Sequence, residues 1–388
     1  MNLADIQQEL RKQNLDGWLF FDHHMRDPLA YRILGIPTGK VTRRWYYMIP
    51  AHGDPTGMEH RIERNTLAGL PGEKIAYSTW AEQIAALGRL TAGMKRVAMA
   101  YSPMCAVPYV ANVDAGTVEL VRSTGVEVVT AAELIQIFEA RWTPAALESH
   151  LEAGRRVDTV RAAAFDLIRE RTRNGALLQE VEVMHFVRKG FADAGLLTDS
   201  GPIVGCNANA SNPHYEPSET VTSPIKWGDW VLLDMWAKLD QPDAVYYDIT
   251  WTAFCGDTPS EEHYKVFNTV RDARDAAIAR VQHGVSKGED LRGFQVDDAA
   301  RAVIVNAGYG EYFTHRTGHS IGVEVHGNGA NMDNFETHDE RRVMPWSCFS
   351  IEPGIYLPHF GVRSEINMFI GEGVARVTGD IQRELVRL

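Results

Sequence analysis

The sequence predicts an α+β protein in which a smaller α/β domain precedes a larger mixed domain. Three observations support this fold class. The chain has 388 residues, enough for about two domains of roughly 150 residues or more. Short apolar runs alternate with helical patterns over the first 140 residues, which is typical of α/β units. Arg141-Trp142-Thr143-Pro144 then reads as a boundary, so we expect domains at 1–142 and 143–388.

The first domain is predicted element by element from its hydrophobic periodicity. Residues 1–17 show the apolar spacing of an amphipathic helix, and Trp80–Leu90 shows it again. Apolar runs bounded by polar residues predict buried strands at 17–21, 97–101 and 126–129.

The second domain should begin with a long helix. Thr143 is a suitable N-cap and Pro144 suits a first helical turn. Helical patterns then cover 144–173 and 180–194. Strands and hairpins follow over 201–256, helices over 260–308, and strands from 321 to the end.

Composition excludes several functional classes. With 39 Lys+Arg against 51 Asp+Glu, the net charge is −12, which argues against nucleic acid as a partner. The four cysteines are dispersed, with no zinc-type spacing, so we expect a reducing, cytoplasmic location. No apolar run reaches about 18 residues. Residues 1–6 enter a helix pattern directly, so neither a membrane span nor a signal peptide is expected.

Two aspartates stand on neighbouring predicted strands. Asp234 ends an apolar strand, Asp248 lies inside the next, and the turn-forming segment 240–243 lies between them. A hairpin centred on Gln241 would place the two carboxylates directly opposite each other, where they repel unless a cation or a proton separates them. The alternative is a looser hairpin in which one aspartate faces solvent.

Histidines gather in the segment 315–326. His315 and His319 are four residues apart, but Thr317 and Gly318 argue against a helical zinc motif. The segment 321–326 alternates like a strand, which would place Glu324 and His326 on one face. A lone histidine is more often a satisfied polar residue than a ligand, whereas a cluster of three favours a site.

Two further carboxylates complete the candidate set. Glu352 ends an apolar strand that Pro353-Gly354 stops. Arg363 and Glu365 alternate on one face, either in the site or as a solvated salt-bridged edge. Four carboxylates and an imidazole suit two divalent ions such as Mn²⁺, Co²⁺, Zn²⁺ or Fe²⁺. Two such ions balance four negative charges and can hold a bridging hydroxide that attacks a carbonyl.

In this order and context, the residues resemble the pita-bread metallopeptidases, the family of methionine aminopeptidase, aminopeptidase P and prolidase. The matching stretches span about 145–388, and the most specific are His315–His319 and Ile351–Tyr356. The smaller N-terminal domain is similar to that of the prolidase, aminopeptidase P and creatinase branch. The resemblance implies a C-terminal pita-bread fold preceded by a creatinase-type α/β domain.

The resemblance also implies a role for each residue. Asp234 would bind the first metal, Asp248 and Glu365 would bridge both ions, and His319 and Glu352 would complete the shell of the second. Glu352 would also act as general acid/base. His326 and His214 would contact the substrate, and His315, Arg363 and Trp236 would surround the pocket.

The implied enzyme is a metallopeptidase that cleaves the bond before proline, in Xaa-Pro dipeptides or at peptide N-termini. The implied cofactor is two divalent ions, Mn²⁺ first and Co²⁺ or Zn²⁺ as alternatives. The implied assembly is a homodimer. A metal-dependent hydrolase or lyase of a non-peptide amide or amidine is the alternative. The retained ligand set argues against a non-catalytic binding protein.

Some positions depart from the family pattern. Trp236 stands two residues after the first aspartate, where glycine is usual, and Trp251 stands between Thr250 and Thr252 in place of arginine. The segment between the two aspartates is also a few residues longer. By strand alternation Trp251 should pack beneath the site, with a reshaped pocket as the alternative. Whether proline is required therefore stays open.

Overall fold

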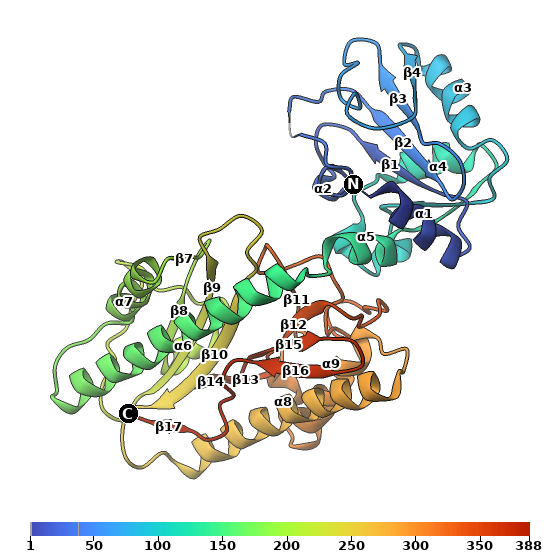
Figure 1. Cartoon of the computed structure of the whole chain (residues 1–388). Helices are drawn as coiled ribbons and strands as arrows, with labels where there is room; N and C mark the ends of the chain where they lie inside the picture. The colour runs from blue at the N-terminus through green and yellow to red at the C-terminus, as the bar shows by residue number, and fades with distance from the viewer. Residues whose placement is uncertain (1, 38) are drawn as a thin grey trace. The chain divides into compact units, whose positions relative to one another are not determined.

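The computed structural model describes residues 2–37 and 39–388 of the chain. It divides into two compact units, Met1–Glu139 and Ala140–Leu388, whose elements are labelled in Figure 1. Within the described residues, no helix is both long enough and apolar enough to cross a membrane.

The N-terminal unit is built on one mixed sheet in the order β4-β3-β2-β1-β5-β6. The central strand β1 is buried along its whole length, as its apolar run predicts. It pairs antiparallel with β2 and parallel with β5. The strands are β1 Gly17–Asp22, β2 Trp45–Pro50, β3 Thr56–His60, β4 Glu73–Tyr77, β5 Arg96–Met99 and β6 Glu127–Thr130.

The helices of this unit follow the expected alternation with strands. The predicted helix at 80–90 is confirmed as α3, and Thr79 and Glu82 close its N-terminus as a capping box. The helices are α1 Leu3–Lys12, α2 Pro28–Leu34, α3 Trp80–Leu90, α4 Ala115–Arg122 and α5 Ala132–Glu139, with short 3₁₀ turns η1 Pro103–Cys105 and η2 Pro108–Val110.

The C-terminal unit holds two sheets and a hairpin. The first sheet has the order β17-β10-β9-β7 with β8 also paired to β9, and the second has the order β11-β12-β15-β16. The strands are β7 Leu196–Leu197, β8 Ile203–Cys206, β9 Trp230–Leu239, β10 Tyr247–Phe254, β11 Ser320–Ile321, β12 Ser347–Ile351, β13 Gly354–Leu357, β14 Phe360–Arg363, β15 Ile366–Ile370, β16 Ala375–Thr378 and β17 Val386–Arg387.

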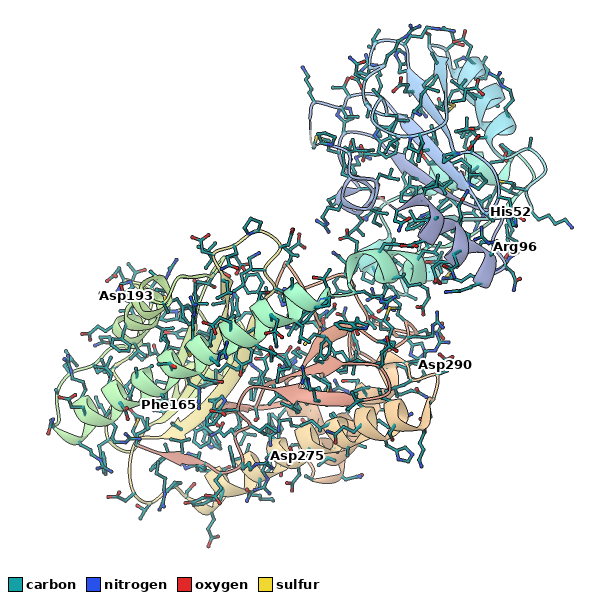
Figure 2. The ribbon with its side chains drawn as sticks, viewed as in Figure 1. His52, Arg96, Phe165, Asp193, Asp275 and Asp290 are labelled. Carbon is teal, nitrogen blue, oxygen red and sulfur yellow. The ribbon has the colours of Figure 1, made fainter. Side chains whose placement is uncertain are left out.

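Two pairs of helices cover these sheets. Helix α6 packs along β9 and β10, whereas α8 packs against β12, β14 and β16. The helices are α6 Pro144–Arg173, α7 Glu180–Asp193, α8 Glu261–Lys287 and α9 Gly293–Asn306, with 3₁₀ turns η3 Asn207–Ser211 and η4 Gly310–Tyr312. Figure 2 labels one buried and one exposed side chain of these helices: Phe165 of α6 is buried in the core, and Asp275 of α8 is exposed.

The start of α6 confirms the predicted cap. The Thr143 hydroxyl accepts a hydrogen bond from the Ala146 backbone N–H at 3.1 Å, and Pro144 occupies the first turn. Both choices are physically favoured, because a helix N-terminus has unpaired N–H donors and proline has none to leave unpaired.

The predicted register of the β9–β10 hairpin was wrong by two residues. Asp234 lies opposite Thr250, and Asp248 lies opposite Trp236. The connection, residues 240–246, is too long to be a tight symmetric turn, and Asp243 adopts a left-handed conformation within it. Because the shift is an even number of residues, both aspartates still share one face, as diagonal rather than direct neighbours.

The strand expected at 321–326 was also wrong, because β11 ends at Ile321. The backbone turns instead: the Gly322 N–H donates to the Glu324 carbonyl at 3.1 Å, and the Gly327 N–H donates to the Ser320 carbonyl at 2.6 Å. Alternation of side chains therefore gives no shared face to Glu324 and His326.

Candidate metal centre

Every side chain named from the sequence as a candidate site residue lines one cavity of about 530 Å³ in the C-terminal unit. The strands β9 and β10 contribute the aspartates, and the ends of β12 and β14 contribute the glutamates. The lining set is Asp234, Asp248, His319, Glu352, Glu365, His214, His315, His326, Arg363 and Trp236. Segments far apart in the sequence thus converge on a single site.

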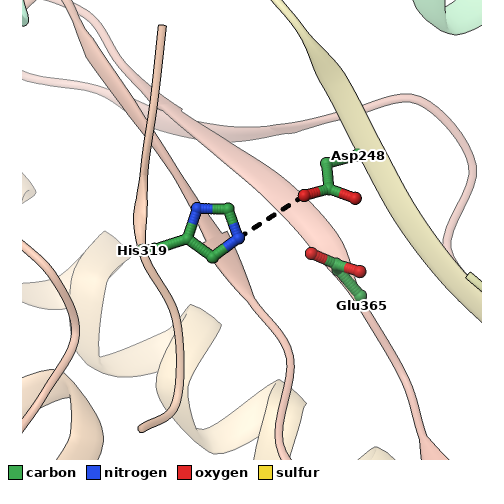
Figure 3. A group of neighbouring side chains, drawn as sticks. All are labelled: Asp248, His319 and Glu365. Carbon is green, nitrogen blue, oxygen red and sulfur yellow. Dashed lines mark ion pairs between the residues drawn. The ribbon is translucent and has the colours of Figure 1, made fainter. Parts of the chain in front are cut away.

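The tightest group in the cavity consists of Asp248, His319 and Glu365. One donor atom from each lies within 4.8 Å of the others, and Figure 3 shows the three side chains pointing toward one another. His319 Nε2 is 3.4 Å from Asp248 Oδ2 and 3.4 Å from Glu352 Oε1. Glu352 therefore borders the same group.

The backbone sets the tautomer of His319. Its Nδ1 lies 3.1 Å from the Ser320 carbonyl oxygen, which can only accept. The Nδ1 atom therefore carries the proton, and the Nε2 lone pair faces the carboxylates. A ring held in this way has the orientation that metal-binding histidines usually adopt.

Arg363 and Thr250 connect Asp234 to Glu365. The Arg363 guanidinium donates to Asp234 Oδ2 through Nη2 and to the Thr250 hydroxyl through Nε, at 3.0 Å for the latter. The Thr250 hydroxyl in turn donates to Glu365 Oε2 at 2.8 Å. Arg363 is only 2% exposed, so the alternative of a solvated salt-bridged edge was wrong.

The carboxylates of the site are in an electrostatically costly arrangement. Burial and the neighbouring acids raise the pKa of Asp248 and of Glu365 well above their ordinary values. Burial also raises the pKa of Glu352, reinforced by Asp248 and Asp234. Four carboxylates face one buried guanidinium, and the uncompensated negative charge favours cations.

The donor set passes a direct test of whether it fits metal ions. Asp234 Oδ1 and Glu365 Oε1 are buried and have no hydrogen-bond partner among the residues that the structure describes. An unpartnered buried carboxylate oxygen is expensive unless a cation coordinates it. Hard oxygen donors with one imidazole also match the preferences of Mn²⁺, Co²⁺ and Zn²⁺.

His315 supports Arg363 indirectly, because both side chains form a hydrogen bond with the Tyr356 hydroxyl. Its Nε2 lies 2.6 Å from the Tyr356 hydroxyl, and its Nδ1 lies 2.6 Å from the Arg316 carbonyl. Arg363 Nη1 donates to the same Tyr356 hydroxyl at 3.0 Å. Burial, with the nearby Arg363 charge, lowers the pKa of His315 to about 3, so the ring is neutral and accepts from Tyr356.

The remaining predicted residues line the cavity further from this group. The rings of His326 and His319 lie 4.4 Å apart in an edge-to-face arrangement. Trp236 faces the cavity across the strand from Asp248, and its Nε1 donates to Asp199 Oδ1 at 2.8 Å. Asp199 and Trp236 therefore shape one wall of the cavity together.

Trp251 lies on the opposite face of β10, as strand alternation predicts. The Arg161 guanidinium of α6 stacks over its ring at 3.6 Å from the centroid. This departure from the family pattern therefore concerns packing beneath the sheet.

Some residues that organise the site were not predicted from the sequence. Thr250 links Arg363 to Glu365, Ser350 donates to Glu352 Oε1 at 3.1 Å, and Asn367 bonds the backbone of Asp248 on both sides. Asp199 was missed as well. The only sequence signal for Thr250, Ser350 and Asn367 is that each stands two residues from a candidate metal ligand, on the same strand or its continuation.

The sequence matches a known family and named relatives. Residues 148–372 match the family model described as metallopeptidase family M24. The sequence is 33% identical over 224 residues to the Xaa-Pro dipeptidase of Lactobacillus helveticus, covering 58% of this chain and 55% of that protein. It is 32% identical over 215 residues to the Xaa-Pro dipeptidase of Lactobacillus delbrueckii subsp. lactis, covering 55% and 53%. The match thus spans about half the length of these curated relatives.

Solved structures resemble the whole chain. Dipeptidase PepE from Mycobacterium ulcerans superposes with a TM-score of 0.70 at 24% identity, covering 99% of this chain and 96% of that chain. Prolidase from Thermococcus sibiricus gives 0.65 at 24% identity, covering 100% and 98%. At this identity the likeness concerns the fold, and it confirms the expected pita-bread domain preceded by a smaller α/β domain.

Proposed function

The chain belongs to metallopeptidase family M24, and on this premise we propose that it hydrolyses the bond before proline, in Xaa-Pro dipeptides or at peptide N-termini. The observation that carries the proposal is the convergence of four carboxylates and the Nε2 lone pair of His319 in one cavity. The names of the two Lactobacillus relatives support the choice of substrate.

We propose that two divalent ions are held by Asp234, Asp248, His319, Glu352 and Glu365, with Mn²⁺ first and Co²⁺ or Zn²⁺ as alternatives. Asp248 and Glu365 would serve both ions, Asp234 the first, and His319 and Glu352 the second. The support is the charge balance of four carboxylates against two divalent cations and the unpartnered oxygens of Asp234 and Glu365. Ions bound there would polarise a carbonyl group and lower the pKa of water.

Glu352 is the proposed general acid/base. The Ser350 hydroxyl donates to its Oε1 at 3.1 Å, which fixes the carboxylate. The other oxygen, Oε2, lies 3.9 Å from Arg363 Nε. In this proposal Oε2 takes a proton from the attacking water and returns it to the departing proline nitrogen. Positioned carboxylates contribute about 10²- to 10⁴-fold by such transfers.

The histidines and arginine have supporting roles in the proposal. His326 and His214 line the cavity and would hold the substrate carbonyl and its tetrahedral product of attack. Arg363, held by Tyr356 and Thr250, would keep the Asp234 carboxylate oriented. Trp236 and Asp199 would limit the size of the residue before proline.

The proposed setting is a cytoplasmic homodimer. The four cysteines are free thiols, in keeping with a reducing compartment. Analytical ultracentrifugation of the purified chain measures the oligomeric state.

Proline release from a Xaa-Pro dipeptide by the Mn²⁺-loaded protein tests the function. Glu365→Gln serves as the paired variant because it keeps the shape of the side chain and removes the charge. Wild-type release together with loss of both release and bound metal in the variant is the expected result. A wild-type protein that binds metal but releases no proline would contradict the substrate. A variant with wild-type metal content and turnover would contradict the site.

A tripeptide Xaa-Pro-Xaa substrate separates the two forms of the proposal. A dipeptidase cleaves only the dipeptide, whereas an aminopeptidase also cleaves the tripeptide. The same series with alanine in place of proline measures whether proline is required.

A further inference from the structure

The N-terminal unit contains a second cavity, of about 710 Å³. It is lined by the loop after β1, the segment before β2, the segment between β4 and α3, and the beginning of α4; Figure 1 labels these elements. The proposed peptidase chemistry makes no use of it. Its cationic and titratable nitrogen groups are His23, His24, Arg26, Arg43, Arg44 and His60.

The positive charge in this cavity is only partly offset by nearby carboxylates: Asp22 accepts from the Arg26 N–H at 2.6 Å, and Glu63 accepts from the Arg43 N–H at 3.0 Å. Within residues 2–37 and 39–388, none of the three arginines forms an ion pair with a carboxylate. Asp114 is the one acid that lines the cavity. Its carboxylate accepts from the Thr117 N–H at 2.9 Å and from the Thr117 hydroxyl at 2.8 Å. In a chain with a net charge of −12, such a concentration of basic groups in a hollow is a specific feature.

The loop that carries His23, His24 and Arg26 is held rigidly by a buried acid. Asp22 accepts from the N–H groups of Met25 at 2.8 Å and Arg26 at 2.6 Å, and from the Tyr31 hydroxyl at 2.8 Å. His24 and Met25 both adopt left-handed backbone conformations, with φ of 65° and 57°. Such conformations cost energy and persist where the surroundings enforce them, so the backbone that carries these cationic groups is preorganised.

The charges around His23 are mostly positive. Burial, followed by the charges of His24, Arg26 and Arg44, lowers the pKa of His23, and the Asp22 carboxylate opposes this shift. Gly116 and Thr117 of the first turn of α4 also line the cavity, and the Asp114 carboxylate caps this helix. The three arginines that line the cavity favour an anion over a further cation.

We propose that this cavity binds a small, multiply charged oxyanion of the phosphate or diphosphate type. Arginines, with their planar donor forks, are the side chains best suited to recognise phosphate oxygens. The Trp80 side chain also lines the cavity and is 74% exposed. Its free ring face can stack on a planar group, so the phosphate can be free or belong to an ester that carries a base.

Calorimetric titration of the full chain with sodium pyrophosphate tests the proposal. Arg26→Gln and Arg43→Gln each remove one cation from the cavity, and each should weaken binding by about tenfold or more, because each removes a charge-assisted hydrogen bond to the anion. Arg89→Gln is the matched control, since Arg89 lies exposed on α3 of the same unit, outside the cavity. It should change affinity less than about twofold.

Three results would overturn the proposal. The first is an absence of binding at millimolar pyrophosphate. The second is equal weakening by Arg26→Gln and Arg89→Gln, which would indicate a general charge effect. The third is binding that neither cavity variant changes, which would place the anion elsewhere, for example on metal ions. Thermal unfolding of each variant checks that the unit is folded.

A second titration with ADP separates the two sources of phosphate. Tighter binding of ADP than of pyrophosphate, lost in Trp80→Ala, would assign the site to a phosphate ester with a planar group. Equal affinities, unchanged in Trp80→Ala, would assign it to a free phosphate or diphosphate ion.

Discussion

Thr250 offers a sharp test of how the metal centre is organised. Its buried hydroxyl donates to Glu365 Oε2 at 2.8 Å and accepts from Arg363 Nε at 3.0 Å. Thr250→Val keeps the shape and removes both bonds. Each charged group left without this partner costs about 1–3 kcal/mol, so the free energy of unfolding of the metal-free protein should fall by about 3 kcal/mol. Metal affinity or turnover should fall by about 10- to 100-fold, the usual effect of removing a residue that orients a ligand.

Thr252→Val provides the matched control. Thr252 is two residues further along the same strand, is equally buried, and its hydroxyl has no hydrogen-bond partner within the described part of the chain. Removing that hydroxyl should leave stability unchanged or raise it, because an unpaired buried hydroxyl is unfavourable. Urea unfolding followed by fluorescence, Mn²⁺ titration and proline release measure all three quantities. Equal losses in the two variants would refute the hydrogen-bond reasoning, as would a Thr250→Val protein with unchanged metal affinity.

Other parts of the molecule give further expectations. His326→Ala should lower turnover while metal content, measured by mass spectrometry, stays at the wild-type level; loss of metal would mean that His326 is a ligand. Chelation should lower the melting temperature, because a ligand at 1,000 times its Kd stabilises the folded state by about 4.1 kcal/mol; an unchanged melting temperature would count against bound ions. Burial lowers the pKa of His150 from 6.5 to about 4. As the pH falls, the unfolded chain therefore binds this proton before the folded chain does. The free energy of unfolding should decrease by about 3 kcal/mol as the pH falls from 6.5 to about 4. Urea unfolding at several pH values should show a weaker dependence in His150→Gln, and an unchanged dependence would exclude His150 as its source.

Local signals were sufficient for most of the secondary structure. The cap of α6, the helix α3 and the buried strand β1 follow from residue types that act over a few positions. Such preferences are properties of short segments, and tertiary packing agrees with them here. The resemblance of the acidic and histidine motifs to the pita-bread metallopeptidases likewise predicted which side chains would share a cavity.

Pairings between distant segments could not be obtained in this way. The β9–β10 register depends on a connecting segment that bonds elsewhere: the Tyr246 N–H donates to the Gly322 carbonyl, and the Asp240 N–H donates to the Gly195 carbonyl. These long-range bonds shift the pairing by two residues. The early end of β11 has a similar origin in the turn at Gly322 and Gly327.

The sequence by itself indicated which side chains the candidate site contains, because these residues stand in local motifs that end or interrupt apolar strands. The tertiary structure decided how these donors are held. Only the folded chain buries Arg363 between Asp234 and Tyr356 and places the Thr250 hydroxyl between Arg363 and Glu365. Those contacts join β9, β10 and β14, and hydrogen bonds between separate strands leave no pattern in the periodicity of any one of them.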